Sequence, residues 1–356
     1  MPIPSRPFWV TSGNKRSKVK GNTFAQNAIP SGTPGDGDCW FSPEDGDVYF
    51  GYNGEYINYF PPSYGYFIGG QISSPASVIE RINFPFNSGT STHVGNLNEV
   101  KYALGGCNSS NYGYSMGGYN TGTLSSINRI LFPFDSGTAS NVGSLSRNYS
   151  EVPSGNNSSN YGFISGGKIS STYYSSIDRI VFPHDSGTTS AVGNLSGTRR
   201  SAAGNNSSQH GFCAGGDNDN GLSIIDRYLF PFNSGTASHV GNLSVTCNTS
   251  GGNNSSIYGF FCGGSTLSII SRITFPFNSG TASNVGNLSG SKWGAMTNNS
   301  TNYGYIAGGY GSSIVSIIDR ITFPFDSGTA NNIGNLSISR YAGTGIDQTD
   351  FVAQFI

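Results

Sequence analysis

The sequence predicts an all-β protein built by repetition of one unit of about 48 residues. Six Gly-Gly pairs recur at intervals of 48, 49, 49, 48 and 45 residues, beginning at Gly69, Gly117, Gly166, Gly215, Gly263 and Gly308. A Phe-Pro dipeptide follows each pair, and only 10% of the residues are charged whereas 13% are aromatic. This composition favours strands and turns over helices. A residue present in every copy is then most simply explained by the fold.

Each repeat divides into four strand-like segments, of which the first two surround a polar turn. The first segment, strand A, is rich in small residues, as in 202–206, which suits a crowded central position. An Asn-Asn-Ser-Ser turn or a close variant follows in most copies. The second segment, strand B, runs from an aromatic residue to the Gly-Gly pair, as in 112–118 and 303–309. Glycine at its end allows close backbone approach where strands converge.

The third segment, strand C, is the most regular. An isoleucine precedes an arginine by two residues in all six copies, the arginines being Arg81, Arg129, Arg179, Arg227, Arg272 and Arg320. Because side chains alternate along a strand, Ile79 and Arg81 share one face, and Ile82 and Phe84 fill the other, so both faces must be covered. Phe-Pro-Phe-Asp/Asn-Ser-Gly then ends the strand in a turn.

The fourth segment, strand D, has the form Ala-Ser-Asn-Val-Gly-Asn-Leu, with its valine at Val142, Val192, Val240 and Val285. Four strands with short connections form an antiparallel meander of the size of one propeller blade. With the Gly-Gly pair, the neighbouring aromatic residues and a basic residue that opens strand A (Arg200, Lys292, Arg340), the chain resembles the kelch-repeat family over roughly residues 55–356. The tryptophan usual in the last kelch strand is missing, so the resemblance implies a divergent kelch-like β-propeller.

Two blade counts are compatible with the repeats. Residues 340–345 look like another strand A and residues 350–356 like another strand B, while strand-like runs at 39–41, 47–52 and 55–60 precede the first repeat. We expect the run at 55–60 to be strand A of the first blade. The other two would complete a seventh blade with the C-terminal pair, because joining both termini leaves no open edge. The alternative is a six-bladed ring with a separate N-terminal hairpin.

The N-terminal region carries a second resemblance. Gly37-Asp38-Cys39-Trp40, followed by residues 46–50 and by Glu55-Tyr56, is similar to a short β-element of bacteriophage tail-fibre and other virion proteins, in which Asn/Ser/Gly-rich propeller-like repeats follow it. Residues 1–36 contain five basic residues before the first acidic one, Asp36. We interpret 1–36 as an extended basic arm that anchors the chain to a larger assembly, and 37–356 as the propeller, with 37–62 completing the ring.

Several function classes find no support in the residues. The net charge of −1 gives no case for nucleic acid or an anionic membrane, and no apolar run is long enough for a membrane span or a signal peptide. His93 and His239 occupy one repeat position three blades apart, too far for a shared metal site. Glu80, Asp178, Asp226 and Asp319 stand next to the repeated arginines, but their recurrence indicates a structural ladder. We therefore expect no enzyme, no cofactor and no metal, and we expect the cysteines to be free.

The variable loops point to a binding face. In an up-and-down blade the A–B and C–D turns lie on one face of the disc and the B–C and D–A loops on the other. The first set scarcely varies between copies, whereas the second set varies freely and is rich in aromatic and basic residues. Binding residues are disproportionately found on loops over a rigid scaffold. The candidate binding residues are Tyr102, Tyr119, Tyr174, Arg200, Asp217, Trp293, Tyr310 and Tyr341.

These observations suggest a non-enzymatic virion protein of a bacteriophage, structural or for attachment, located in the tail, a fibre or the capsid after synthesis in the host cytoplasm. The expected partners are other virion proteins bound through the arm, a host-surface glycan or protein bound by the propeller, and further copies of the chain. The alternative is a cytosolic kelch-like module for protein–protein interaction. Fold resemblance alone does not decide between them, because propellers serve many functions.

Overall fold

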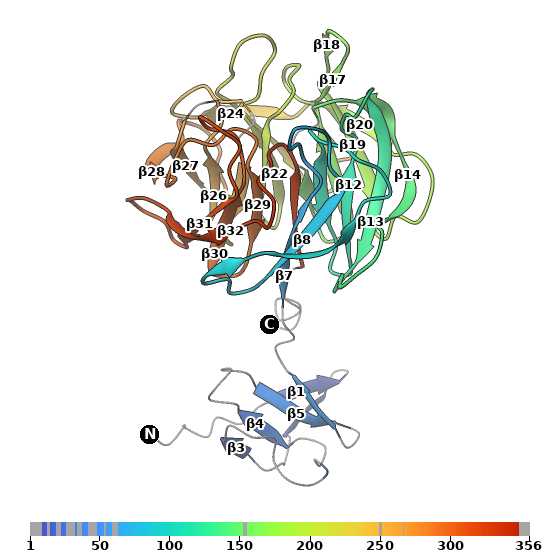
Figure 1. Cartoon of the computed structure of the whole chain (residues 1–356), viewed down its shortest axis with the longest axis vertical. Coiled ribbons are helices and arrows are strands. Elements are labelled where there is room, and N and C mark those ends of the chain that lie inside the picture. Colours follow the sequence, from blue (N-terminus) through green and yellow to red (C-terminus); the bar gives the residue numbers. More distant parts are fainter. Residues whose placement is uncertain are drawn as a thin grey trace. The chain divides into compact units, whose positions relative to one another are not determined.

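The computed structural model describes residues 9–12, 15–18, 23–25, 33, 38–41, 48–52, 55–58, 63–151, 155–248, 251–265 and 267–348. Every regular element in these ranges is a β-strand. The chain forms two compact units, the larger of which spans Ser63–Thr349. This larger unit is a β-propeller of six four-stranded antiparallel blades around a common axis, so the predicted fold class is confirmed (Figure 1).

Each blade runs from strand A at the axis to strand D at the rim. Blade 1 comprises β33 (Thr344–Asp347), β7 (Tyr64–Ile68), β8 (Val78–Asn83) and β10 (Thr92–Asn96). Blade 2 comprises β11 (Gly105–Asn108), β12 (Tyr112–Met116), β13 (Leu124–Leu131) and β14 (Ser140–Tyr149). Blade 3 comprises β15 (Asn156–Asn157), β16 (Tyr161–Ser165), β19 (Ser176–Val181) and β20 (Ser190–Asn194).

The other three blades repeat the same order. Blade 4 comprises β21 (Ala203–Asn206), β22 (His210–Ala214), β23 (Ile224–Leu229) and β24 (Ser238–Asn242). Blade 5 comprises β25 (Gly251–Asn254), β26 (Tyr258–Cys262), β27 (Ile269–Thr274) and β28 (Ser283–Asn287). Blade 6 comprises β29 (Met296–Asn299), β30 (Tyr303–Ala307), β31 (Ile317–Thr322) and β32 (Asn331–Asn335).

Three short strands lie outside this scheme. The B–C loop of blade 3 is a hairpin of β17 (Lys168–Ile169) and β18 (Thr172–Tyr173), which stands out beyond the blades in Figure 1. The C–D turn of blade 1 contains β9 (Gly89–Thr90), which pairs in parallel with β32 of blade 6. Single bridges repeat this contact between the other neighbouring blades, as in Asn96–Thr138. Each outer strand is therefore partly covered by the next blade, which protects the sheet edges.

The predicted seven-bladed ring is wrong, and the six-bladed alternative is correct. Strand A of blade 1 is β33, which follows blade 6 and pairs with β7 in the register Thr344–Ile68 to Asp347–Gly65. The ring thus closes within one blade, by one strand from the C-terminal end of the repeats and three from the N-terminal end. No further strands are needed to remove the open edge. The strand B expected at 350–356 lies outside the described residues.

The run predicted as strand A of blade 1 belongs to the smaller unit. Here a parallel pair and two antiparallel pairs join β3 (Thr23–Ala25), β4 (Cys39–Phe41), β5 (Val48–Tyr52) and β6 (Glu55–Asn58) into one sheet. A separate hairpin pairs β1 (Trp9–Ser12) with β2 (Lys15–Lys18). Strands β1, β2 and β3 fall within residues 1–36, whose interpretation as an anchoring arm stays a prediction. Short β-strands can take up a Gly-, Pro- and Ser-rich chain when a neighbouring strand offers its backbone groups.

Aromatic stacking explains why the Phe-Pro motif recurs. The phenylalanine before each proline stacks on the strand B aromatic of a neighbouring blade, with ring centroids 5.1 to 5.4 Å apart, in the pairs Tyr66–Phe132, Tyr114–Phe182, Phe163–Phe230, Phe212–Phe275, Phe260–Phe323 and Phe84–Tyr305. The six Phe–Pro peptide bonds are all cis. Large aromatic surfaces buried between blades contribute strongly to packing. The motif therefore joins each blade to the next.

The six strand C arginines form a second ring of contacts between blades. Each guanidinium binds the Asp or Asn of the Phe-Pro-Phe-Asp/Asn turn in a neighbouring blade, in the pairs Arg81–Asp135, Arg129–Asp185, Arg179–Asn233, Arg227–Asn278, Arg272–Asp326 and Arg320–Asn87. Five of them also lie over a strand B tyrosine, as Arg129 does over Tyr112 at 4.5 Å. The expected structural ladder is present, but its partners are these turn residues.

Candidate functional site

Six paired positions surround the mouth of the propeller on the face that carries the B–C and D–A loops. In each blade the residue after the Gly-Gly pair meets, backbone to backbone, a residue shortly before strand A. Five of these contacts are β-bridges: Gln71–Tyr341, Tyr102–Tyr119, Ser150–Lys168, Arg200–Asp217 and Trp293–Tyr310. In blade 5 the amide of Ser265 donates to the carbonyl oxygen of Asn248 at 2.9 Å. A constant backbone arrangement therefore holds a different pair of side chains in every blade.

The residue that follows each inner member of these pairs has an unusual backbone conformation. Its φ is between +54° and +66° in all five blades where it is described, at Ala103, Glu151, Ser201, Gly294 and Ala342. Only one of the five is glycine, although this region is unfavourable for other residues. The amides link neighbouring blades around the mouth: Ala342 N donates to Gly294 O at 2.7 Å and Ala103 N to Ala342 O at 2.6 Å. These bonds hold the mouth residues in place.

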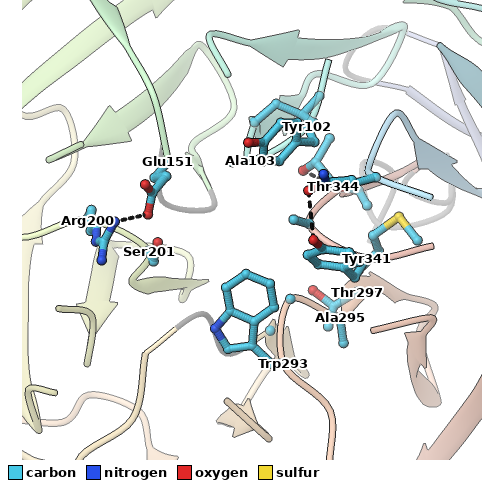
Figure 2. A pocket seen from close by; sticks show the side chains of 18 of the residues that line it. Tyr102, Ala103, Glu151, Arg200, Ser201, Trp293, Ala295, Thr297, Tyr341 and Thr344 are labelled. Atoms are coloured by element: carbon cyan, nitrogen blue, oxygen red, sulfur yellow. Dashed lines mark hydrogen bonds and ion pairs between the residues drawn. The ribbon is translucent and has the colours of Figure 1, made fainter. Parts of the chain in front are cut away.

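A cavity of about 390 Å³ opens at the centre of these pairs, a volume within the range of small-molecule sites. Figure 2 shows the Glu151–Arg200 ion pair facing Tyr102 and Tyr341 across the opening, with Trp293 on a third side. The rest of the lining is mostly small or apolar residues in the inner strands or immediately before them: Leu104, Ala202, Ala295, Met296, Thr297, Gly343, Thr344 and Gly345.

The inner strands pack tightly against one another around the cavity. A Cβ added to Gly345 would lie 1.9 Å from the carbonyl oxygen of Thr297, and one added to Gly252 would lie 2.0 Å from that of Gly204. Neighbouring strands A thus touch through their backbones, as the small residues of this segment predict. The pocket is thus surrounded by closely packed inner strands and by residues of the variable D–A loops.

Aromatic side chains occupy one half of the mouth, formed by blades 6, 1 and 2. Trp293 packs on Tyr341 with ring centroids 5.1 Å apart, and Tyr310 reaches the same tyrosine at 5.8 Å. Tyr102 and Tyr119 form a second, edge-to-face pair at 5.8 Å. The Tyr341 hydroxyl donates to Gln71 Oε1 at 2.7 Å. The pKa values of Tyr102 and Tyr341 are raised by burial, so both hydroxyls are neutral at physiological pH.

Polar side chains occupy the other half, formed by blades 3, 4 and 5. Arg200 makes ion pairs with Glu151 and, through Nε, with Asp217 at 3.3 Å. Burial raises the pKa of Asp217, but the amide of Asp219, Asn248 Nδ2 and Arg200 stabilise its charged form more, so the net shift is downward. The two carboxylates in turn stabilise the charged Arg200 and raise its pKa despite its burial. The guanidinium charge is thus balanced within the protein.

The structure gathers most of the candidate binding residues at this mouth. Tyr102, Arg200, Trp293 and Tyr341 line the pocket, and three others are their bridge partners: Tyr119, Asp217 and Tyr310. Tyr174 lies apart, because its ring packs on buried Tyr149 at 5.8 Å and lies under the guanidinium of Arg147. Whether any of them binds a ligand stays a prediction.

The expectation that the basic residues of the D–A loops collect on the binding face is wrong for four of them: Lys101, Arg199, Lys292 and Arg340 are at most 1% exposed. Three pair with strand C carboxylates, namely Arg199–Asp226 at 2.7 Å, Lys292–Asp319 at 3.2 Å and Arg340–Glu80 at 3.0 Å. Side chains alternate along strand C, so the acidic residue and the strand C arginine that follows it, such as Asp226 and Arg227, point to opposite sides of the strand. The acidic residue therefore meets the buried basic residue before strand A, and the strand C arginine meets a turn of the neighbouring blade.

Sequence reasoning missed the place of Glu151 at the mouth and the pairing of the loops, because no local pattern distinguishes Glu151 from other loop residues. The signal that could have found it is register: it follows Ser150 as Ala103 follows Tyr102 and Ser201 follows Arg200. Aligning the repeats on the residue that opens strand A would have placed all these positions around one mouth.

The described residues contain no group of three or more His, Cys, Asp or Glu side chains arranged to hold a metal ion. Nor do they include a helix that could cross a lipid bilayer. Cys107, Cys213 and Cys262 are buried free thiols, as expected, and Cys247 is buried as well. No family model matches the chain, and no curated protein is similar to it in sequence. The β-propeller thus rests on the structure itself, whereas the kelch-like and virion resemblances rest on sequence motifs.

Proposed function

We propose that this protein is a non-enzymatic virion protein of a bacteriophage, structural or for attachment, and that its propeller presents the mouth to a host-surface glycan or protein. The binding part of this proposal is supported by the variation of residues between blades, which is concentrated at the mouth, where the backbone is held rigidly. Six equivalent backbone contacts hold six different side-chain pairs, while strand C and the A–B and C–D turns repeat nearly unchanged. Such diversity on a fixed frame suits recognition by several unlike contacts at once.

The pocket favours binding over catalysis. Arg200 and the two carboxylates that it contacts are paired with one another, and the tyrosines of the pocket are neutral. A general acid or base needs a pKa near the working pH and access to the substrate. The pKa shifts at Asp217 and Arg200 run away from neutrality. The proposal of a virion setting is supported by the likeness of the Gly37–Trp40 segment to phage virion proteins.

The test is detection of the protein in purified particles. Gold-labelled antibody against the propeller, used in electron microscopy of the phage that carries this sequence, should mark one defined part of the virion. Purified full-length protein should also bind host cells, and Trp293→Ala should weaken that binding. A protein that is absent from particles and is recovered bound to a cytosolic protein would instead support the kelch-like interaction module and overturn the virion proposal.

A further inference from the structure

The mouth is divided into an aromatic half and a polar half, and this division determines which ligands fit. Going around the ring, the inner positions read Tyr341, Tyr102, Ser150, Arg200, Asn248 and Trp293 for blades 1 to 6. The aromatic members are contiguous, and Figure 2 shows them around the pocket from the Glu151–Arg200 ion pair. A ligand that fills the pocket therefore meets an apolar surface on one side and hydrogen-bonding groups on the other.

We propose that the pocket binds the terminal residue of an uncharged glycan, which inserts end-on from the side of the variable loops. This inference rests on the proposed binding function and specifies its ligand. A pyranose ring has a face of C–H groups that packs on aromatic rings, and a rim of hydroxyls that both donate and accept hydrogen bonds. The aromatic half supplies the rings, and Glu151 and Arg200 supply a paired acceptor and donor.

The charges at the mouth argue for a neutral ligand. Arg200 already contacts the carboxylates of Glu151 and Asp217, so its charge is not free to hold a carboxylate or phosphate of the ligand. A third carboxylate, Asp219, lies nearby and accepts the Tyr173 hydroxyl at 2.5 Å. An anionic sugar in the pocket would lie beside the carboxylate of Glu151, which lines it, and like charges repel. A cation would compete with Arg200 for the carboxylates of Glu151 and Asp217.

The shape of the pocket argues for a terminal residue. Neighbouring inner strands are in close contact, since Gly345 and Gly252 meet the backbone of the next strand. All six blades surround the opening, and the β17–β18 hairpin of blade 3 stands above the rim (Figure 1). A glycan chain thus has no groove to lie along at the pocket and must enter by one end.

The site is preformed. The bridges and the inter-blade hydrogen bonds at Ala103 and Ala342 hold the backbone. Tyr341 is fixed by Gln71 and Trp293, and Arg200 by its two carboxylates. Binding therefore needs little ordering of the protein, which favours affinity for a small ligand.

The test uses the full-length protein and a panel of methyl glycosides: neutral hexoses, N-acetylhexosamines and N-acetylneuraminic acid as the acidic member. Saturation-transfer NMR and calorimetry should detect at least one neutral glycoside, with affinity nearly independent of salt concentration. Trp293→Ala should weaken that binding by about tenfold or more through loss of stacking. Leu131→Ala, which removes an exposed apolar side chain on strand C of blade 2, is the control and should bind like the wild type.

The variant Glu151→Gln tests whether the charge of Glu151, rather than the shape of the pocket, selects the ligand. The change keeps the size of the side chain but releases part of the Arg200 charge, so neutral glycosides should bind about tenfold more weakly and the acidic glycoside more strongly than to the wild type. The inference is overturned if the wild type prefers the acidic glycoside, if Trp293→Ala leaves neutral binding unchanged, or if no glycoside binds. Binding of host cells in this last case would show that the proposed attachment function survives with a protein ligand.

Discussion

The strand C arginines and the mouth residues are two rings of the same propeller with opposite patterns of variation. Each ring has one member per blade. The arginines join neighbouring blades, and the mouth residues join two loops of the same blade. The arginine is identical in all six copies, whereas the inner mouth position holds three aromatic residues, an arginine, a serine and an asparagine. The arginine must bind a turn in the next blade through its side chain, so the side chain is constrained.

At the mouth the backbone alone makes the structural contact. The bridges of Tyr102 with Tyr119 and of Arg200 with Asp217 use amide and carbonyl groups that every residue has. These bridges set no requirement on the side chains, which can therefore differ between blades. In this repeat protein a position keeps the same residue in every blade where its side chain makes the contact between blades. Where backbone groups alone make the contact, the residue can vary, and its side chain is available to a ligand.

The largest expected effect lies in ring closure. Gly345→Val places side-chain atoms against the carbonyl oxygen of Thr297, which a Cβ alone would approach to 1.9 Å. The closing strand β33 could not pack at the axis, and we expect the free energy of unfolding to fall by more than about 3 kcal/mol. Chemical denaturation measures it. Gly122→Val, where the new side chain meets open space, is the control. Equal effects of the two changes would contradict tight packing at the axis.

The next largest loss of stability is expected from breaking a buried ion pair, such as Arg199–Asp226. Asp226→Ser leaves Arg199 buried without a carboxylate, which should cost about 4 kcal/mol. Blade 5 shows the uncharged version of this arrangement, with Cys247 and Ser271 at the two positions. The double variant Arg199→Cys/Asp226→Ser should therefore recover much of the lost stability. A double variant as unstable as the sum of its single changes would show that the two positions are not coupled.

Buried Lys101 should make the stability of the protein depend on pH. It is buried like Lys292, but its blade has Asn128 where blades 1, 3, 4 and 6 have an acidic residue. Burial lowers the pKa of Lys101 to about 7, and Glu99, 3.9 Å away, offsets this only in part. The native state therefore binds fewer protons than the unfolded chain between about pH 7 and 10.5, and stability rises with pH across that window. Lys101→Met should be more stable than the wild type at pH 7, and the advantage should shrink by on the order of 1 kcal/mol per pH unit above it.

The matched change Lys292→Met gives the opposite sign, because it leaves the buried Asp319 without its cation. Thermal unfolding of the wild type and both variants at several pH values would measure the two effects. If Lys101→Met lowered stability at pH 7, the side chain would be making a favourable contact and the interpretation of its burial would be wrong.

The smallest effects compare the two rings directly. Arg179→Ala removes hydrogen bonds to Asn233 and to the carbonyl of Phe232 and should cost about 1 kcal/mol, since the ladder is partly exposed. Lys168→Ala, at a mouth position, should change stability by less than about 0.5 kcal/mol. Denaturant midpoints give both values. A mouth change that destabilised more than the ladder change would remove the distinction between a constrained ring and a free one.

The fold was predictable because each repeat carries its own strand pattern. The alternation of Ile79, Arg81 and Ile82 sets the two covered faces of strand C, and the Phe-Pro-Phe-Asp/Asn turn ends it, as the structure confirms. The blade count was not predictable by the same means. The segment at 55–60 has a strand pattern as good as that of 344–347, and only long-range pairing decides that β7 takes β33 as its partner.

The candidate site also has features that could be predicted from the sequence and features that could not. Period and local residue type are enough to predict the repeat, its four strands and the loops that vary. The arrangement of the blades is needed to show which loop residues turn inward and which reach the pocket: the buried ones are Lys101, Arg199, Lys292 and Arg340, and their neighbours at the pocket are Tyr102, Arg200, Trp293 and Tyr341. Adjacent residues of a chain point in opposite directions, and which direction is the interior depends on where the other blades lie.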